Sequence, residues 1–215
     1  MPPENLLLAF DTSAAHCAVA LLLGNRVLAA RSEEMNKGQA ERLFPMLQEM
    51  LADCDKTWAD LSAIGVGIGP GNFTGIRLSV SAARGLALSL KVPAIGVSML
   101  EALRFGHEGI VLATLDARRD QLYVQSSAEE PARVIPIGNL NDQITTKIDL
   151  CVGHKAPEIA ERLNAQVSAP KFPTEVAIAR IASSRLGQEN PRPAPMYLKA
   201  PDAAPSRDSA PVILE

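Results

Sequence analysis

The first half of the chain alternates short apolar runs with longer amphipathic segments. Three apolar runs open it, at 6–10, 17–23 and 27–30, and a Gly-Asn pair between the last two is typical of a hairpin turn. From 37 to 53 the apolar residues recur every three or four positions, which predicts an amphipathic helix, bent at Pro45. The pattern predicts an antiparallel three-stranded meander followed by a helix.

The alternation continues to about residue 105. We expect a buried strand at 63–68, a glycine-rich loop at 69–75, a long helix at 76–90, a short strand at 94–97 and a short helix at 99–105. The order is therefore β-β-β-α-β-α-β-α, which favours a sheet of mixed rather than purely parallel pairing.

The second half repeats the opening of the first. An apolar run at 110–115 ends in Asp116, as the run at 6–10 ends in Asp11, and a second strand follows each at the same interval. Such self-similarity indicates a duplicated unit. Further strands are expected near 133–137 and 150–152, with helices near 157–164 and 175–186. We predict an α/β, actin-like (ASKHA, ribonuclease-H-like) duplicated fold with two lobes, the second one reduced, in which a nucleotide usually lies between the lobes.

These elements predict the domain organisation. Residues 1–106 form an N-terminal actin-like lobe, and residues 107–199 a smaller C-terminal lobe. Prolines concentrate in the last 25 residues beside Ala, Ser and Asp, so 200–215 is expected to be a flexible tail.

Composition narrows the class of protein. The chain has 215 residues, of which 47% are hydrophobic and 21% charged, and its net charge of -3 gives no overall attraction to nucleic acid or anionic lipid. Three widely spaced cysteines favour neither a disulfide framework nor a zinc site, and fit a reducing cytoplasm. No apolar run approaches the length that spans a bilayer, and the N-terminus carries no secretion signal, so we expect no membrane association.

Two segments could bind a phosphorylated ligand. The turn Asp11, Thr12 and Ser13 offers a carboxylate for Mg²⁺ and hydroxyls for phosphate, although Asp and Ser also stabilise ordinary turns. The glycine-rich loop, with Gly69, Gly71 and Thr74, leads into a helix N-terminus, where an anion could bind. The loop lacks the Gly-Lys-Ser/Thr ending of a P-loop, so tight packing against a neighbouring lobe or chain is an equally good interpretation.

The remaining polar residues give weaker indications. The turn that contains Asp116 and Arg118 is either a solvated hairpin or a polar site between lobes or facing a partner. The three histidines lie in separate segments and are interpreted as ordinary turn or surface residues. We expect no metal site and no catalytic nucleophile.

Several blocks of sequence carry a family resemblance. They are the stretch Gly-Pro-Gly-Asn-Phe-Thr-Gly-Ile-Arg at 69–77, the Phe-Asp-Thr-Ser at 10–13, the Asp-Ala-Arg-Arg at 116–119 and the Pro-Met-Tyr-Leu-Lys at 195–199. In order and spacing they resemble the bacterial TsaB (YeaZ) family over nearly the whole chain up to about Lys199.

The resemblance implies a role and a set of partners. TsaB proteins assist the threonylcarbamoylation of the adenosine next to the anticodon in tRNA, while a paralogue, TsaD, carries the catalytic site and the ATPase TsaE joins the complex. It implies a cytoplasmic, non-catalytic subunit with no cofactor of its own, and leaves open whether ATP or ADP binds at the complex junction. Because the net charge is small, we expect contact with tRNA to be indirect or weak. We also expect a homodimer, formed through apolar helix surface, when the chain is alone.

The catalytic paralogues hold metal with a His-x-x-x-His pair, and the corresponding positions here are Ser98 and Ala102. Alanine cannot ligate a metal, and a lone serine is a poor ligand for iron or zinc. This difference favours a subunit that activates an enzyme. The alternative functions are an independent actin-like ATPase or small-molecule kinase that uses Asp11 and the loop 67–75, and a metallopeptidase.

Two helical stripes suggest a partner surface. They could form a four-helix bundle with the equivalent helices of a paralogue. The predicted interface comprises Leu43, Met46, Leu47, Met50, Ile76, Val80, Ala83 and Ala87. In the alternative interpretation these residues face the protein's own sheet. Because the second helix is apolar on two sides, we expect one side to be left for a partner.

Overall fold

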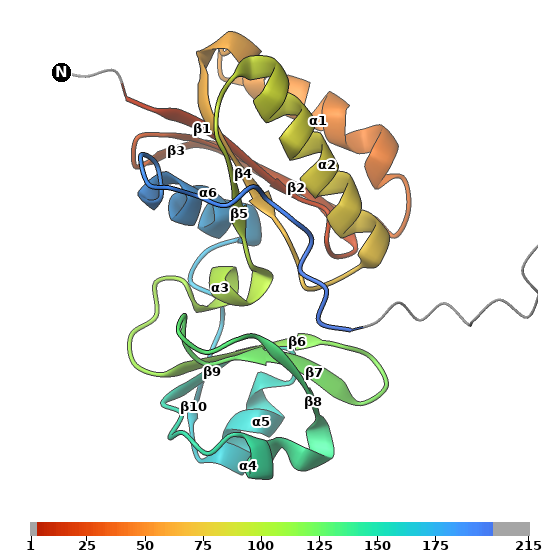
Figure 1. The fold of residues 1–215 in the computed structure, drawn as a ribbon, viewed down its shortest axis with the longest axis vertical. Helices are drawn as coiled ribbons and strands as arrows, with labels where there is room; N and C mark the ends of the chain where they lie inside the picture. Colours follow the sequence, from red (N-terminus) through yellow and green to blue (C-terminus); the bar gives the residue numbers. More distant parts are fainter. Residues whose placement is uncertain (1–3, 200–215) are drawn as a thin grey trace, which may run out of the picture.

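Two five-stranded sheets organise the molecule, and the computed structural model describes residues 4–199 (Figure 1). The first sheet has the order β3-β2-β1-β4-β5. Its strands are β1 (Leu6–Asp11), β2 (His16–Leu23), β3 (Arg26–Glu34), β4 (Leu61–Gly67) and β5 (Ala94–Val97). β1 pairs antiparallel with β2, and β2 with β3, whereas β4 lies parallel to both β1 and β5. The predicted meander and the mixed pairing are confirmed.

Helices cover both faces of the first sheet. The helices α1 (Gln39–Asp53) and α2 (Phe73–Leu90) lie on one face, and α6 (Thr174–Ser184) lies on the other (Figure 1). Side chains of β1 alternate between the two layers, with Leu8 and Phe10 in the core beneath α1 and α2, and Leu7 and Ala9 in the core beneath α6. This strand is buried on both sides, which is why it reads as a continuous apolar run.

The second sheet repeats the topology of the first with shorter elements. Its order is β10-β9-β6-β7-β8, with β6, β7 and β8 antiparallel and β9 and β10 parallel to β6. The strands are β6 (Val111–Asp116), β7 (Gln121–Gln125), β8 (Arg133–Pro136), β9 (Leu150–Gly153) and β10 (Gln166–Ser168). The helices α4 (Leu140–Gln143) and α5 (Ala156–Leu163) close a core on one face. The duplication and the smaller second lobe are therefore both observed.

The third helix of each repeat packs on the sheet of the other repeat. α3 (Met99–Arg104) follows β5 of the first sheet, yet Leu100 joins the core of Val111, Ala113 and Val152 on the second. α6 follows β10 of the second sheet but packs on β1, β2 and β4 of the first. The predicted lobe boundaries, 1–106 and 107–199, are wrong in this respect, because both helices are apolar enough to pack across the junction of the lobes.

Most predicted elements are present, with differences at their ends. α2 begins at Phe73 rather than at 76, because the Asn72 side chain accepts a hydrogen bond from the Gly75 amide at 3.0 Å and caps the first turn. β10 and α4 were not predicted, since three or four residues are too few to show a periodicity. The predicted tail, 200–215, lies outside the described residues.

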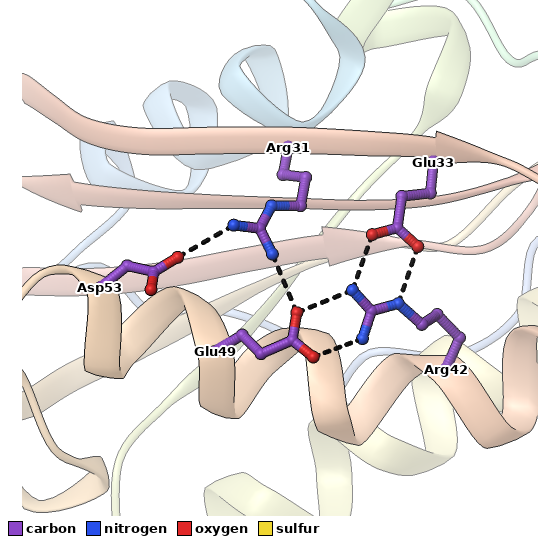
Figure 2. Close-up of polar contacts among 5 residues, drawn as sticks. All are labelled: Arg31, Glu33, Arg42, Glu49 and Asp53. Carbon is purple, nitrogen blue, oxygen red and sulfur yellow. Dashed lines mark hydrogen bonds and ion pairs between the residues drawn. The ribbon is translucent and has the colours of Figure 1, made fainter.

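A network of charges fastens the edge strand β3 to α1 (Figure 2). Arg42 on α1 binds Glu33 on β3 at 2.6 Å and Glu49 at 2.7 Å, and Arg31 on β3 binds Glu49 and Asp53, each at 2.9 Å. The hydrogen bonds from Arg42 lower the pKa of both Glu33 and Glu49. Charges along an exposed edge also discourage pairing with another strand.

Candidate functional site

Asp11, Thr12 and Ser13, where β1 ends, are buried, and their polar groups form hydrogen bonds within the chain. The Asp11 Oδ2 atom accepts hydrogen bonds from the Ser13 amide at 3.0 Å and the Ser13 hydroxyl at 2.9 Å. The Thr12 hydroxyl donates to the Gly75 carbonyl at 2.7 Å. Both hydroxyls that the sequence offered to a phosphate therefore have intramolecular acceptors.

The glycine-rich loop packs directly on this turn. A Cβ on Gly71 would overlap the Ser13 carbonyl oxygen, and one on Gly75 would overlap that of Thr12, both well under the 3.0 Å that real Cβ atoms keep. The Asn72 amide donates to the Ser13 carbonyl at 2.6 Å. The glycines permit close contact between two backbones within the first lobe. The loop is tightly packed, but its neighbour is the β1 turn rather than a neighbouring lobe or chain.

The free oxygen of Asp11 does not face an open site. Asp11 Oδ1 has no hydrogen-bond partner and is buried against Gly67, where a Cβ would overlap it. A Mg²⁺ ion needs open carboxylate positions and room for several waters. The turn therefore does not fit a metal-bound phosphate.

His16 and Glu175 complete this buried polar cluster, and neither was singled out in the sequence. His16 Nε2 lies 2.7 Å from Asp11 Oδ2, and Glu175, in the first turn of α6, is 5% exposed. Burial alone lowers the pKa of His16, but the hydrogen bond to Asp11 and the charges of Asp11 and Glu175 outweigh it and raise the pKa. Burial raises the pKa of Glu175, partly offset by His16. The expectation that all three histidines are ordinary turn or surface residues is thus wrong for His16.

These pKa shifts predict that the protein loses stability as the pH rises. A raised pKa means that the folded state prefers the protonated form, so the stabilisation is full at low pH and is lost above the folded-state pKa. We expect the thermal midpoint to fall between about pH 5 and pH 9, and His16→Gln to flatten the upper part of that profile. Calorimetry at several pH values measures this, with the exposed His154→Gln as the control. An unchanged slope in His16→Gln would contradict the assignment.

The other predicted site residues do not all join this cluster. Gly69 packs on Ile76, and its carbonyl accepts from the Met99 amide at 2.8 Å. Thr74 instead lines a groove of about 640 Å³ between the first turns of α1 and α2. Asp116 and Arg118 lie in the β6–β7 turn, where the Asp116 carboxylate accepts from the Arg118 amide at 2.8 Å. This local bond is typical of the hairpin interpretation.

The predicted partner residues are mostly core residues. Seven of the eight have an exposed fraction of 2% or less, and Ala87 is half-buried. The seven are Leu43, Met46, Leu47, Met50, Ile76, Val80 and Ala83. The stripe was placed on the wrong side of the helices, because apolar periodicity identifies a buried face without saying what buries it.

A second apolar stripe lies on α2, between its buried side and its exposed side. Leu78, Ala82 and Leu86 follow one another at four-residue spacing and are half-buried. Phe44 on α1 is 42% exposed and Leu88 on α2 is 79% exposed. These residues therefore leave more apolar surface accessible on the helices of the first lobe than the eight predicted interface residues do.

The positions that correspond to the paralogues' metal pair have structural roles. Ser98 is the N-cap of α3, and its hydroxyl accepts from the Leu100 amide at 3.2 Å. Ala102 is buried in the core shared by α3 and α6. Among residues 4–199, no three His, Cys, Asp or Glu side chains come together in a way that could hold a metal ion.

Within the same residues, no helix is both long and apolar enough to cross a membrane.

The repeated β-sheet topology, with helices on both faces of each sheet, defines an actin-like, ribonuclease-H-like α/β protein. Component A of (R)-2-hydroxyglutaryl-CoA dehydratase from Acidaminococcus fermentans has this fold, with a TM-score of 0.53 and 8% identity over 85% of this chain and 99% of that chain. The structure of YeaZ from Pseudomonas aeruginosa is more similar, with a TM-score of 0.70 and 28% identity over 90% of this chain and all of that chain.

Sequence comparisons identify the family. The model for TsaD, tRNA N6-adenosine threonylcarbamoyltransferase, matches residues 28–193. The tRNA threonylcarbamoyladenosine biosynthesis protein TsaB of Bacillus subtilis is 39% identical over 120 residues, which are 54% of this chain and 52% of that protein. The chain belongs to the TsaB (YeaZ) family. It spans about half the length of the curated TsaB relatives it matches.

Proposed function

We propose that the chain is a non-catalytic cytoplasmic subunit required for the N6-threonylcarbamoyladenosine modification of tRNA. In this role it binds and activates a TsaD-like catalytic paralogue together with a TsaE-like ATPase, and forms a homodimer when alone. The names of its relatives support the pathway. The proposal places tRNA contact and any nucleotide at the assembled complex rather than on this chain alone.

The closed turn at Asp11 is the observation that carries the non-catalytic assignment. Catalysis of phosphoryl transfer depends on donors and carboxylates that are aimed at the substrate. Here the Thr12 and Ser13 hydroxyls and Asp11 Oδ2 already bind groups of the same chain, and Asp11 Oδ1 is covered by Gly67. The chain has a fold that binds nucleotides in other proteins, but here the polar groups of the β1 turn stabilise the chain's own structure.

The proposed partner surface is the half-buried stripe of α2 together with Phe44 of α1, and it does not include Leu88. The stripe of Leu78, Ala82 and Leu86 on α2 lies next to a helix, α1, that exposes Phe44. Small and aliphatic side chains on two adjacent helices allow close packing against two helices of a second protein. A paralogue with the same pair of helices is a suitable occupant.

Reconstitution of the modification tests the function. Purified TsaD-like and TsaE-like proteins, tRNA and threonylcarbamoyl-adenylate are combined with and without this chain, and the modified nucleoside is measured by mass spectrometry. We expect modification to depend on the chain and to persist with a folded Asp11→Asn variant, because Asp11 has no catalytic role. ATP turnover by the isolated chain that is lost in Asp11→Ala would instead support the ATPase or kinase alternative.

A further inference from the structure

Residues 191–199, here called the C-terminal strap, connect the two lobes on one side of the molecule (Figure 1). Pro193 is buried beside Gly96 of β5, and the Met196 amide donates to the Ile68 carbonyl at 2.8 Å. Further along, Lys199 Nζ donates to the Ala117 carbonyl in the β6–β7 turn at 2.8 Å. The strap therefore runs from the edge of the first sheet, past the start of the glycine-rich loop, to the second lobe.

An aromatic and cationic cluster fastens the middle of the strap. The Tyr197 ring lies 4.9 Å from that of Phe73, and the Tyr197 hydroxyl accepts a hydrogen bond from Arg77 Nε at 2.9 Å. The Arg77 guanidinium lies 3.8 Å from the centre of the Phe73 ring. All three residues are partly exposed to solvent, so these contacts can break without opening a hydrophobic core.

The two segments where the chain crosses between the lobes are held by apolar packing, unlike the strap. The chain passes from the first sheet to the second through Ser98 and α3, and returns between β10 and α6. At these crossings Phe105 and Phe172 pack with ring centres 5.6 Å apart, in the apolar core that includes α6. Figure 1 shows the crossings and the end of the strap on opposite sides of the junction between the lobes.

We propose that the strap is a displaceable clamp that sets the separation of the two lobes. The apolar crossings act as the hinge, and the polar contacts of Tyr197 and Lys199 hold the opposite side closed. When the strap is released, the lobes rotate about α3 and expose the Ile68 end of the glycine-rich loop and Ala117, the buried residue of the β6–β7 turn. This device belongs to the isolated chain and does not depend on the proposed function.

Hydrogen–deuterium exchange of the full chain tests the clamp. In the double variant Tyr197→Ala/Lys199→Ala we expect amides of residues 68–72 and 117–121 to exchange roughly tenfold faster, with β1 unchanged. Small-angle scattering should show a larger radius of gyration. The matched control is Arg192→Ala, an exposed position of the same strap outside these contacts, which should change neither measurement. Tyr197→Phe, which removes the hydrogen bond with Arg77 and keeps the ring, should give a smaller effect.

Unchanged exchange at both segments in the double variant overturns the proposal, because the strap then contributes nothing to closure. Faster exchange throughout β1 also overturns it, since the strap would then be part of the cooperative fold rather than a displaceable clamp. Faster exchange confined to the two segments, with an unchanged far-ultraviolet circular dichroism spectrum, supports it whether or not a partner protein is ever found.

Discussion

Replacing Gly75 with alanine is expected to lower the free energy of unfolding by more than about 4 kcal/mol, which is enough to unfold many domains of this size. The added Cβ would overlap the Thr12 carbonyl oxygen, a backbone atom in a turn that is itself buried. The same two residues are joined by the hydrogen bond from the Thr12 hydroxyl to the Gly75 carbonyl. The backbones at Thr12 and Gly75 cannot move apart without breaking the contact between β1 and α2. Urea denaturation followed by circular dichroism measures the effect.

Gly85→Ala is the matched control, because it makes the same change in the same helix. No atom lies within 4 Å of the position that its Cβ would take. Alanine favours a helix over glycine, so this variant should be more stable by about 0.5–1 kcal/mol. If the two variants had similar stabilities, the close approach of the turn and the loop would be wrong.

The sequence predicted the fold well because the signals of the first sheet are local. The strands of the meander and the helices α1 and α2 are long enough to show their periods, and the repeat that begins with the apolar run at 110–115 predicted the second sheet. The exchange of α3 and α6 between the lobes could not be predicted. It depends on which surface buries each helix, and that information is in the tertiary packing rather than in the period.

The site was predicted less well, for a similar reason. The sequence draws attention to Asp11 and the glycine-rich loop, but it does not predict their contact with each other. Its two interpretations of the loop are phosphate binding and packing against a neighbouring lobe or chain. His16 could have been found, since it follows Asp11 across a short turn between two paired strands. Glu175 reaches the cluster from the other end of the chain, and no local pattern marks it. The sequence therefore points to Asp11 and the glycine-rich loop, and the structure shows that they stabilise the fold where β1 meets α2.

The largest effect expected on complex formation comes from a charge on the half-buried stripe of α2. Leu86→Asp should weaken binding to a TsaD-like partner by roughly 100-fold or more, because a carboxylate would be buried without a partner at the helix–helix contact. Leu86 is half-buried in the free chain, so a modest loss of stability is expected and circular dichroism must show a folded variant. Calorimetric titration with the purified partner measures the affinity.

Two further variants test whether the effect is specific to this half-buried stripe. Leu88→Asp introduces the same charge on the same helix at a residue that is 79% exposed, about 200° around the axis from Leu86. It should bind nearly as well as the unmodified chain if the stripe is the contact. Met46→Asp, at a residue with no exposed surface, should fail by unfolding the subunit instead. Equal binding by Leu86→Asp and Leu88→Asp would show that the stripe of Leu78, Ala82 and Leu86 is not the partner surface. The groove at the first turns of α1 and α2 would then be the next surface to test by substitution.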